Sequence, residues 1–110
     1  MLLRVAENIF LDSIMSSGGY VYIVSNKHRT VLYIGVTNDI RRRVYEHKNC
    51  EGSKFTSLYN CRYLVYYEWF SEILHAIERE KQLKNWHREW KLNLIRLENP
   101  EMKDLYEDLF

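Results

Sequence analysis

Two short apolar runs lie near the start of the chain, and apolar residues recur at helical spacing farther on. Residues 20–25 and 31–36 are rich in β-branched and aromatic residues and flank the polar segment 26–30, which is the pattern of a β-hairpin. Residues 62–70, RYLVYYEWF, predict a third strand for the same reason. The chain therefore predicts a sheet of three strands.

Helices are expected where apolar residues repeat every three to four positions. The predicted helices cover about 39–48, 72–86 and 87–97. The first follows Thr37-Asn38-Asp39, which supplies a capping residue and an early acidic side chain, and Ser71 is the expected cap of the second. The order β-β-α-β-α-α predicts an α+β fold, a small three-stranded and mainly antiparallel sheet flanked by helices.

Three other segments have patterns of their own. Residues 1–18 run into the flexible sequence SSGG, and we expect them to be an appendage to a domain over 19–110. Residues 49–60 are polar, and we expect an irregular loop there. Asn99 and Pro100 are typical of the cap and first residue of a last short helix.

The charge distribution says more than the net charge, which is +1 for the 110 residues. Segments 27–48 and 79–96 each hold six basic and two acidic residues, whereas 98–108 holds five acidic residues and one lysine. The basic segments indicate either a polyanion-binding surface or two solvated helix faces. Cys50 and Cys61 lack zinc-type spacing and no apolar run has the length of a membrane span, so we expect free thiols, a cytoplasmic location and no membrane partner.

Two tyrosines of the hairpin are predicted to share one face of the sheet. If the turn is centred between residues 28 and 29, Tyr22 lies opposite Gly35 and Val24 lies opposite Tyr33. Tyr22 and Tyr33 are then diagonal neighbours, and Gly35 leaves room for a ligand to approach. Spacing alone also allows both rings to be ordinary core residues.

An acidic residue and a histidine–arginine pair are the other candidates. In the helix after Ser71, Glu80 falls near the centre of an apolar stripe, where a carboxylate needs a cation, a hydrogen-bond network or a metal. An internal ion pair and a Mg²⁺ ligand both satisfy that need. Arg43 and His47 are four residues apart and share a helix face, where an arginine suits phosphate and a histidine can move a proton.

Together these residues resemble the GIY-YIG endonuclease superfamily. Tyr20-Val21-Tyr22 stands at the first motif and Tyr33-Ile34-Gly35 is the second motif intact. Arg43, His47 and Glu80 then follow in the order and at the spacing of that family's arginine, histidine or tyrosine, and metal-binding glutamate. The resemblance is to small single-domain members similar to the N-terminal nuclease module of the bacterial excision-repair endonuclease.

The resemblance implies a metal-dependent endonuclease that hydrolyses phosphodiester bonds in nucleic acid, with DNA favoured over RNA, and a role in repair or recombination. It implies one divalent cation, Mg²⁺ or Mn²⁺, held by Glu80, and a catalytic set of Tyr22, Tyr33, Arg43, His47 and Glu80, with the base left open between Tyr33 and His47. Further nucleic-acid contacts are expected from Gly35, Arg41, Arg42, Lys48, Lys54 and Lys84. The alternative is a non-catalytic or partner-dependent nucleic-acid-binding module of the same fold, with a protein partner or a second copy supplying specificity.

Overall fold

Three antiparallel strands form the centre of the fold, which the computed structural model describes over residues 18–110. The strands are β1 (Gly19–Ser25), β2 (Leu32–Thr37) and β3 (Tyr63–Phe70), and their order in the sheet is β2-β1-β3. β1 is the middle strand and pairs antiparallel with both neighbours. The α+β prediction is confirmed, and the predicted appendage lies outside the described residues apart from Gly18.

The hairpin has the predicted register. Tyr22 pairs with Gly35 and Val24 pairs with Tyr33. The turn holds this register through the side-chain carbonyl of Asn26, which accepts hydrogen bonds from the backbone N–H groups of residues 30 and 31 at 2.8 and 3.0 Å. Because side chains alternate across a strand, Tyr22 and Tyr33 lie on the same face.

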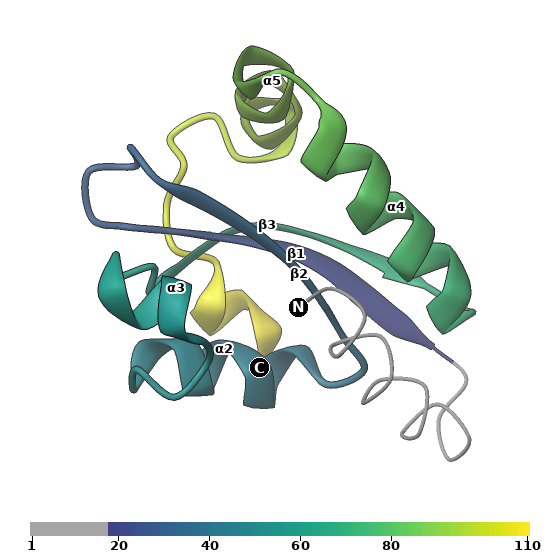
Figure 1. Ribbon diagram of the computed structural model, residues 1–110, viewed down its shortest axis with the longest axis horizontal. Coiled ribbons are helices and arrows are strands. Elements are labelled where there is room, and N and C mark those ends of the chain that lie inside the picture. Colours follow the sequence, from purple (N-terminus) through teal and green to yellow (C-terminus); the bar gives the residue numbers. More distant parts are fainter. Residues whose placement is uncertain (1–17) are drawn as a thin grey trace.

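Helices cover both faces of the sheet (Figure 1). On one face lie α4 (Ile73–Asn85) and α5 (Arg88–Glu98), and on the other lie α2 (Ile40–Lys48), α3 (Lys54–Leu58) and the 3-10 helix η1 (Tyr106–Leu109). Each face has its own apolar core. Val21, Ile23, Ile77 and Leu83 lie in the core beneath α4 and α5, and Tyr22, Val24, Ile40, Val44 and Leu64 lie in the core beneath α2.

The loop predicted over 49–60 contains a helix, α3. Its cap is Ser53, whose side chain accepts a hydrogen bond from the Thr56 N–H while the Thr56 hydroxyl accepts one from the Ser53 N–H. A helix of five residues is too short to show an apolar repeat, so periodicity missed it. Ser53 and Thr56, three positions apart, were the signal that could have indicated it.

Two predicted helix starts are also wrong. The N-cap of α4 is Glu72 rather than Ser71, and no side chain caps that end. Asn99 is the C-cap of α5, where its amide donates to the carbonyls of Val65 and Lys103 at 3.0 and 2.8 Å. Asn99 therefore ties the chain after α5 to the sheet instead of starting a helix. None of the helices within residues 18–110 is long and apolar enough to cross a bilayer.

Candidate active site

Three of the predicted catalytic side chains meet at the hydroxyl of Tyr22. Tyr22 comes from the middle of β1 and is 1% exposed, whereas Arg43 and His47 come from α2. The Tyr22 hydroxyl lies 2.8 Å from His47 Nε2 and 3.3 Å from Arg43 Nε. The prediction that Arg43 and His47 share one helix face is thus confirmed, because both reach the same oxygen atom.

Two glycines let these rings pack closely. A Cβ atom at Gly35 would lie 2.4 Å from the Tyr22 hydroxyl oxygen and 2.5 Å from its Cζ, and a Cβ at Gly52 would lie 2.1 Å from His47 Nδ1. The space that Gly35 leaves is therefore occupied by the Tyr22 ring. This corrects the prediction that the space is open to a ligand: Gly35 serves to position the phenol.

The hydrogen bonds fix the proton of His47. Arg43 Nε donates to the Tyr22 hydroxyl, whose own buried proton has one acceptor among the described residues, His47 Nε2. His47 then carries its proton on Nδ1 and donates it to Thr56 Oγ1, 3.0 Å away. Thr56 thus connects α3 to the site, a role that sequence reasoning missed because it depends on how α3 packs against α2.

Burial changes the protonation of this cluster. Burial, and then the positive charge of Arg43, lower the pKa of His47 to about 3, so His47 is neutral at pH 7. Burial also raises the pKa of Tyr22 far above its ordinary value, although Arg43 opposes the shift. Burial by itself would lower the pKa of Arg43, but the contacts with Tyr22 and Glu46 raise it. At neutral pH the cluster therefore holds a neutral phenol, a neutral imidazole and a guanidinium.

Tyr33 and Arg43 have polar groups that remain free. The Tyr33 ring lies 5.7 Å from the His47 ring and 5.8 Å from the Phe55 ring, and the tyrosine is half-buried. Within residues 18–110 its hydroxyl has no hydrogen-bond partner. Arg43 Nη1 binds Glu46 at 3.0 Å, whereas no described residue accepts a hydrogen bond from Nη2. These two groups can reach a ligand without breaking a contact of the fold.

Glu80 comes from α4, on the other side of the sheet, and is buried as predicted. Its Oε2 lies 3.3 Å from Lys84 Nζ, and its Oε1 is buried with no hydrogen-bond partner in the described part of the chain. Burial raises the pKa of this carboxyl, and Lys84 opposes the shift. The Glu80 charge contributes to the raised pKa of Tyr22, although no hydrogen bond joins the two residues.

The surroundings of Glu80 fit a cation that takes few protein ligands. An unpartnered buried carboxylate oxygen is an unfavourable group that a cation would stabilise. Residues 18–110 hold no group of three or more histidine, cysteine or acidic side chains placed to share a metal. A Mg²⁺ ion, which keeps several waters and binds through one or two carboxylates, matches this donor set better than zinc does.

The residues predicted to contact nucleic acid have different surroundings. Arg41 Nε donates to the Leu109 carbonyl at 2.6 Å, and Lys48 Nζ lies 2.5 Å from Asp104. Both hold the C-terminal segment against α2. Lys84 pairs with Glu80, as described above. Arg42 and Lys54 are exposed, and neither side chain has a partner within the described range, so these two are available to a ligand.

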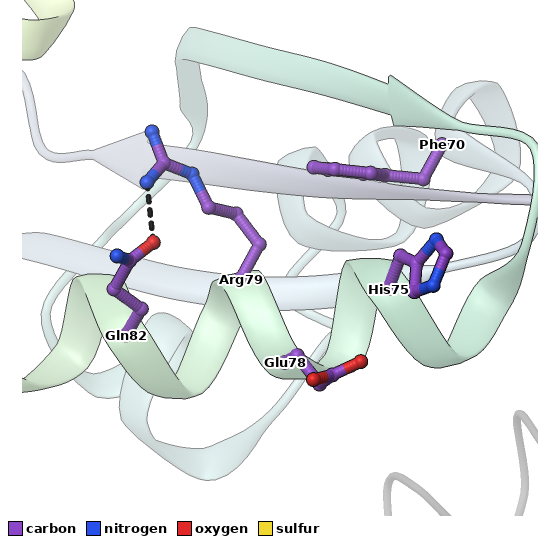
Figure 2. Close-up of a pocket in the computed structure, with 5 residues that line it drawn as sticks. All are labelled: Phe70, His75, Glu78, Arg79 and Gln82. Atoms are coloured by element: carbon purple, nitrogen blue, oxygen red, sulfur yellow. Dashed lines mark hydrogen bonds between the residues drawn. The ribbon is translucent and has the colours of Figure 1, made fainter.

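A hollow of about 430 Å³ lies beside α4 and β3, away from the Tyr22 cluster (Figure 2). Its lining residues are Phe70, His75, Glu78, Arg79 and Gln82. The Arg79 guanidinium donates to Glu68 through Nε and Nη2 and to Gln82 through Nη1. Because these contacts engage all three of its nitrogens, Arg79 is poorly placed to donate to a phosphate. We therefore do not include the hollow in the candidate site.

Comparisons with known proteins identify the family of this chain. Residues 18–93 match the model of the GIY-YIG catalytic domain. UPF0213 protein SSP2268 of Staphylococcus saprophyticus is 40% identical over 69% of this chain and 92% of its own length, and UPF0213 protein HQ_3675A of Haloquadratum walsbyi is 40% identical over 73% and 89%. The solution NMR structure of UPF0213 protein BH0048 from Bacillus halodurans is 28% identical, covers 79% of this chain and 92% of that one, and has a TM-score of 0.49. The chain is a member of the GIY-YIG family of nucleases, similar to its small UPF0213 proteins.

Proposed function

We propose that this chain is a metal-dependent endonuclease that hydrolyses phosphodiester bonds in nucleic acid, with DNA as the preferred substrate. The observation that carries the proposal is the buried Tyr22 hydroxyl, held between Arg43 and His47 beside the free hydroxyl of Tyr33. A structural role alone would not require Arg43 to keep an unpaired donor at the edge of this cluster.

Arg43 is the residue that would bind the scissile phosphate. Its Nε and Nη1 are held by Tyr22 and Glu46, so the guanidinium plane is fixed before substrate arrives. Its side chain is 21% exposed, which leaves Nη2 accessible to a phosphate oxygen. A guanidinium placed in advance stabilises the charge that develops on the phosphate without reorganising at the moment of reaction.

The two phenols and the imidazole have separate roles in this proposal. His47 Nε2 is occupied by the Tyr22 proton and its pKa is about 3, so His47 positions Tyr22 instead of taking a proton from water. Tyr22 presents its oxygen lone pairs toward Arg43. Tyr33 keeps a free hydroxyl, which would accept a hydrogen bond from the attacking water and orient it toward phosphorus.

Glu80 would hold the cation, because its Oε1 has no partner in the described residues. A bound Mg²⁺ or Mn²⁺ would supply positive charge to a non-bridging phosphate oxygen and to the leaving oxygen. Lys84 would then exchange its contact with Glu80 for one with the phosphate backbone.

Cleavage of defined substrates tests the proposal. Supercoiled, nicked, branched and single-stranded DNA, and RNA, are incubated with Mg²⁺, Mn²⁺ or EDTA. We expect metal-dependent cleavage that falls by about two orders of magnitude or more in Glu80→Gln and Tyr33→Phe. Glu78→Gln is the matched control, because it makes the same change at an exposed position of the same helix. Cleavage that survives both site substitutions would refute the proposed active site. A role in repair predicts that nicked or branched DNA is cleaved faster than the other substrates.

The alternative function is a nucleic-acid-binding module that cleaves only with a partner. The Lys84 ammonium favours this alternative, because it lies 3.3 Å from Glu80 and already places a positive charge beside the carboxylate. In that case wild type and Glu80→Gln would bind nucleic acid equally, and neither would cleave it with any metal. Cleavage that appears only when a protein partner is added, or only when the chain self-associates, would also support this alternative.

A further inference from the structure

Three large apolar side chains lie exposed on and directly after the short helix α3. Phe55 is 40% exposed, Tyr59 is 47% exposed and Leu58 is 72% exposed. Isolated exposed apolar residues are common, but a group of them beside a candidate site indicates a binding surface. The remainder of α3 is polar, so these side chains are not the edge of a larger apolar core.

The rings form a row that begins in the candidate site. The Tyr33 and Phe55 rings are stacked at 5.8 Å with 29° between their planes, and the Phe55 and Tyr59 rings follow at 4.7 Å with their planes tilted by 46°. The row therefore leads from the Tyr33 ring to two rings that are exposed to solvent. A ligand whose phosphate lies at Arg43 would place its neighbouring groups over the outer rings.

The position of α3 is fixed by hydrogen bonds to the same site. Thr56, between the two outer rings in sequence, accepts from or donates to Ser53 and bonds His47 Nδ1 at 3.0 Å. Ser57 Oγ donates to the Cys50 carbonyl at 2.9 Å. The rings are thus held in place relative to the catalytic groups. This lowers the entropic cost of ordering the rings when a ligand binds.

The segment that carries the rings is basic overall. Segment 48–62 holds three basic residues and one acidic residue. Lys54, next to Phe55 in sequence, is exposed and has no partner in the part of the chain that the structure describes. Aromatic rings that alternate with cations suit a nucleic-acid strand, whose bases stack and whose phosphates are anionic. A protein partner would account for the rings but not for the free cation.

We propose that Phe55 and Tyr59 form a stacking subsite for the nucleobase next to the scissile phosphate. Because a base in a duplex has both faces covered by its neighbours, the subsite accepts a base that is unpaired, frayed or flipped out. The inference rests on the proposed function for the placement of the phosphate at Arg43, and it assigns base contact to two residues outside the catalytic set.

Binding in EDTA tests the subsite without relying on cleavage. The probes are a single-stranded oligonucleotide containing 2-aminopurine, whose fluorescence falls on stacking, the same strand with an abasic position, and a blunt duplex. We expect wild type to quench 2-aminopurine and to bind the intact strand more tightly than the abasic one. Phe55→Leu and Tyr59→Leu should each weaken binding by roughly 5- to 150-fold and abolish quenching, with duplex binding unchanged.

Trp90→Leu is the matched control, because Trp90 is an aromatic residue of α5 that is 54% exposed and lies outside the row of rings. Circular dichroism checks that every variant is folded. The subsite would be overturned if Phe55→Leu lost binding affinity equally for all three probes. It would also be overturned if wild type self-associates and Phe55→Leu does not, because the surface would then bind a second copy of the chain.

The subsite and the nuclease proposal can fail separately. Metal-dependent cleavage by wild type, with unchanged binding and quenching in Phe55→Leu and Tyr59→Leu, would overturn the subsite and leave the nuclease proposal standing. If wild type quenches 2-aminopurine, Phe55→Leu does not, and wild type cleaves no substrate with any metal, the subsite would be supported and the nuclease proposal overturned.

Discussion

Replacing His47 by glutamine should change how the stability of the fold depends on pH. His47 is 1% exposed, and its hydrogen bonds to Tyr22 and Thr56 use the neutral imidazole. In the fold its pKa is lowered from 6.5 to about 3, by burial first and by Arg43 second. A glutamine at this position can still accept the Tyr22 proton through Oε1, but it does not titrate.

The magnitude follows from proton linkage. Below pH 6.5 the unfolded chain protonates His47 whereas the folded chain does not, so acid favours unfolding and the contribution of His47 to stability is complete only above pH 6.5. Each pH unit below 6.5 costs about 1.4 kcal/mol, so at pH 5 the free energy of unfolding should have fallen by about 2 kcal/mol through this residue. This loss hardly changes as long as the folded pKa lies well below 5.

Urea unfolding followed by circular dichroism between pH 7.5 and pH 5 measures the effect. We expect wild type to lose about 2 kcal/mol more than His47→Gln over this range. His75→Gln is the control, because it makes the same change at a histidine whose side chain is 58% exposed. If the unfolding free energies of wild type and His47→Gln change in parallel with pH, His47 has the same pKa in the folded and unfolded chains. The argument from burial would then be wrong.

The site makes three further predictions. Gly35→Ala places a methyl group 2.4 Å from the Tyr22 hydroxyl, so we expect a loss of about 1–3 kcal/mol in urea unfolding, and unchanged stability would mean that the ring is not confined there. Thr56→Val leaves the buried His47 Nδ1–H without an acceptor and should cost about 1–3 kcal/mol, and Thr56→Ser should restore most of it. Nitrogen-15 NMR should show the Nδ1–H tautomer in wild type, and an Nε2–H tautomer there would contradict the assignment. In Arg43→Lys the ammonium cannot contact both the Tyr22 hydroxyl and a phosphate, as a planar guanidinium can, so cleavage should fall by about 10²-fold or more. Near-wild-type cleavage rates would contradict the role of the guanidinium.

Local spacing made much of the site predictable. Side chains alternate along a strand, so the hairpin register placed Tyr22 and Tyr33 on one face. A helix repeats every 3.6 residues, so four positions were enough to bring Arg43 and His47 to one side of α2. The same repeat placed Glu80 in the apolar stripe of α4, where it is buried. Each of these statements needs only the period of one element.

Contacts between elements were not predictable in this way. The sequence did not indicate that Arg41 and Lys48 hold the C-terminal segment, since their partners lie 68 and 56 residues farther along the chain. As two of a run of basic residues, both looked like ligands for phosphate. A charged side chain takes the partner that packing brings to it, and that partner is set by the path of the whole chain.

The sequence by itself determined the three strands, the pairing of Tyr22 with Gly35, and which side chains share a face, because these depend on backbone periods and on a turn of a few residues. The tertiary structure decided that the Tyr22 ring fills the space over Gly35, that Thr56 accepts the Nδ1 proton of His47, and that Phe55 and Tyr59 continue a row of rings from Tyr33. These three features arise where α2 and α3 pack on the sheet, and packing depends on the shapes of all the side chains in contact, which no single segment contains.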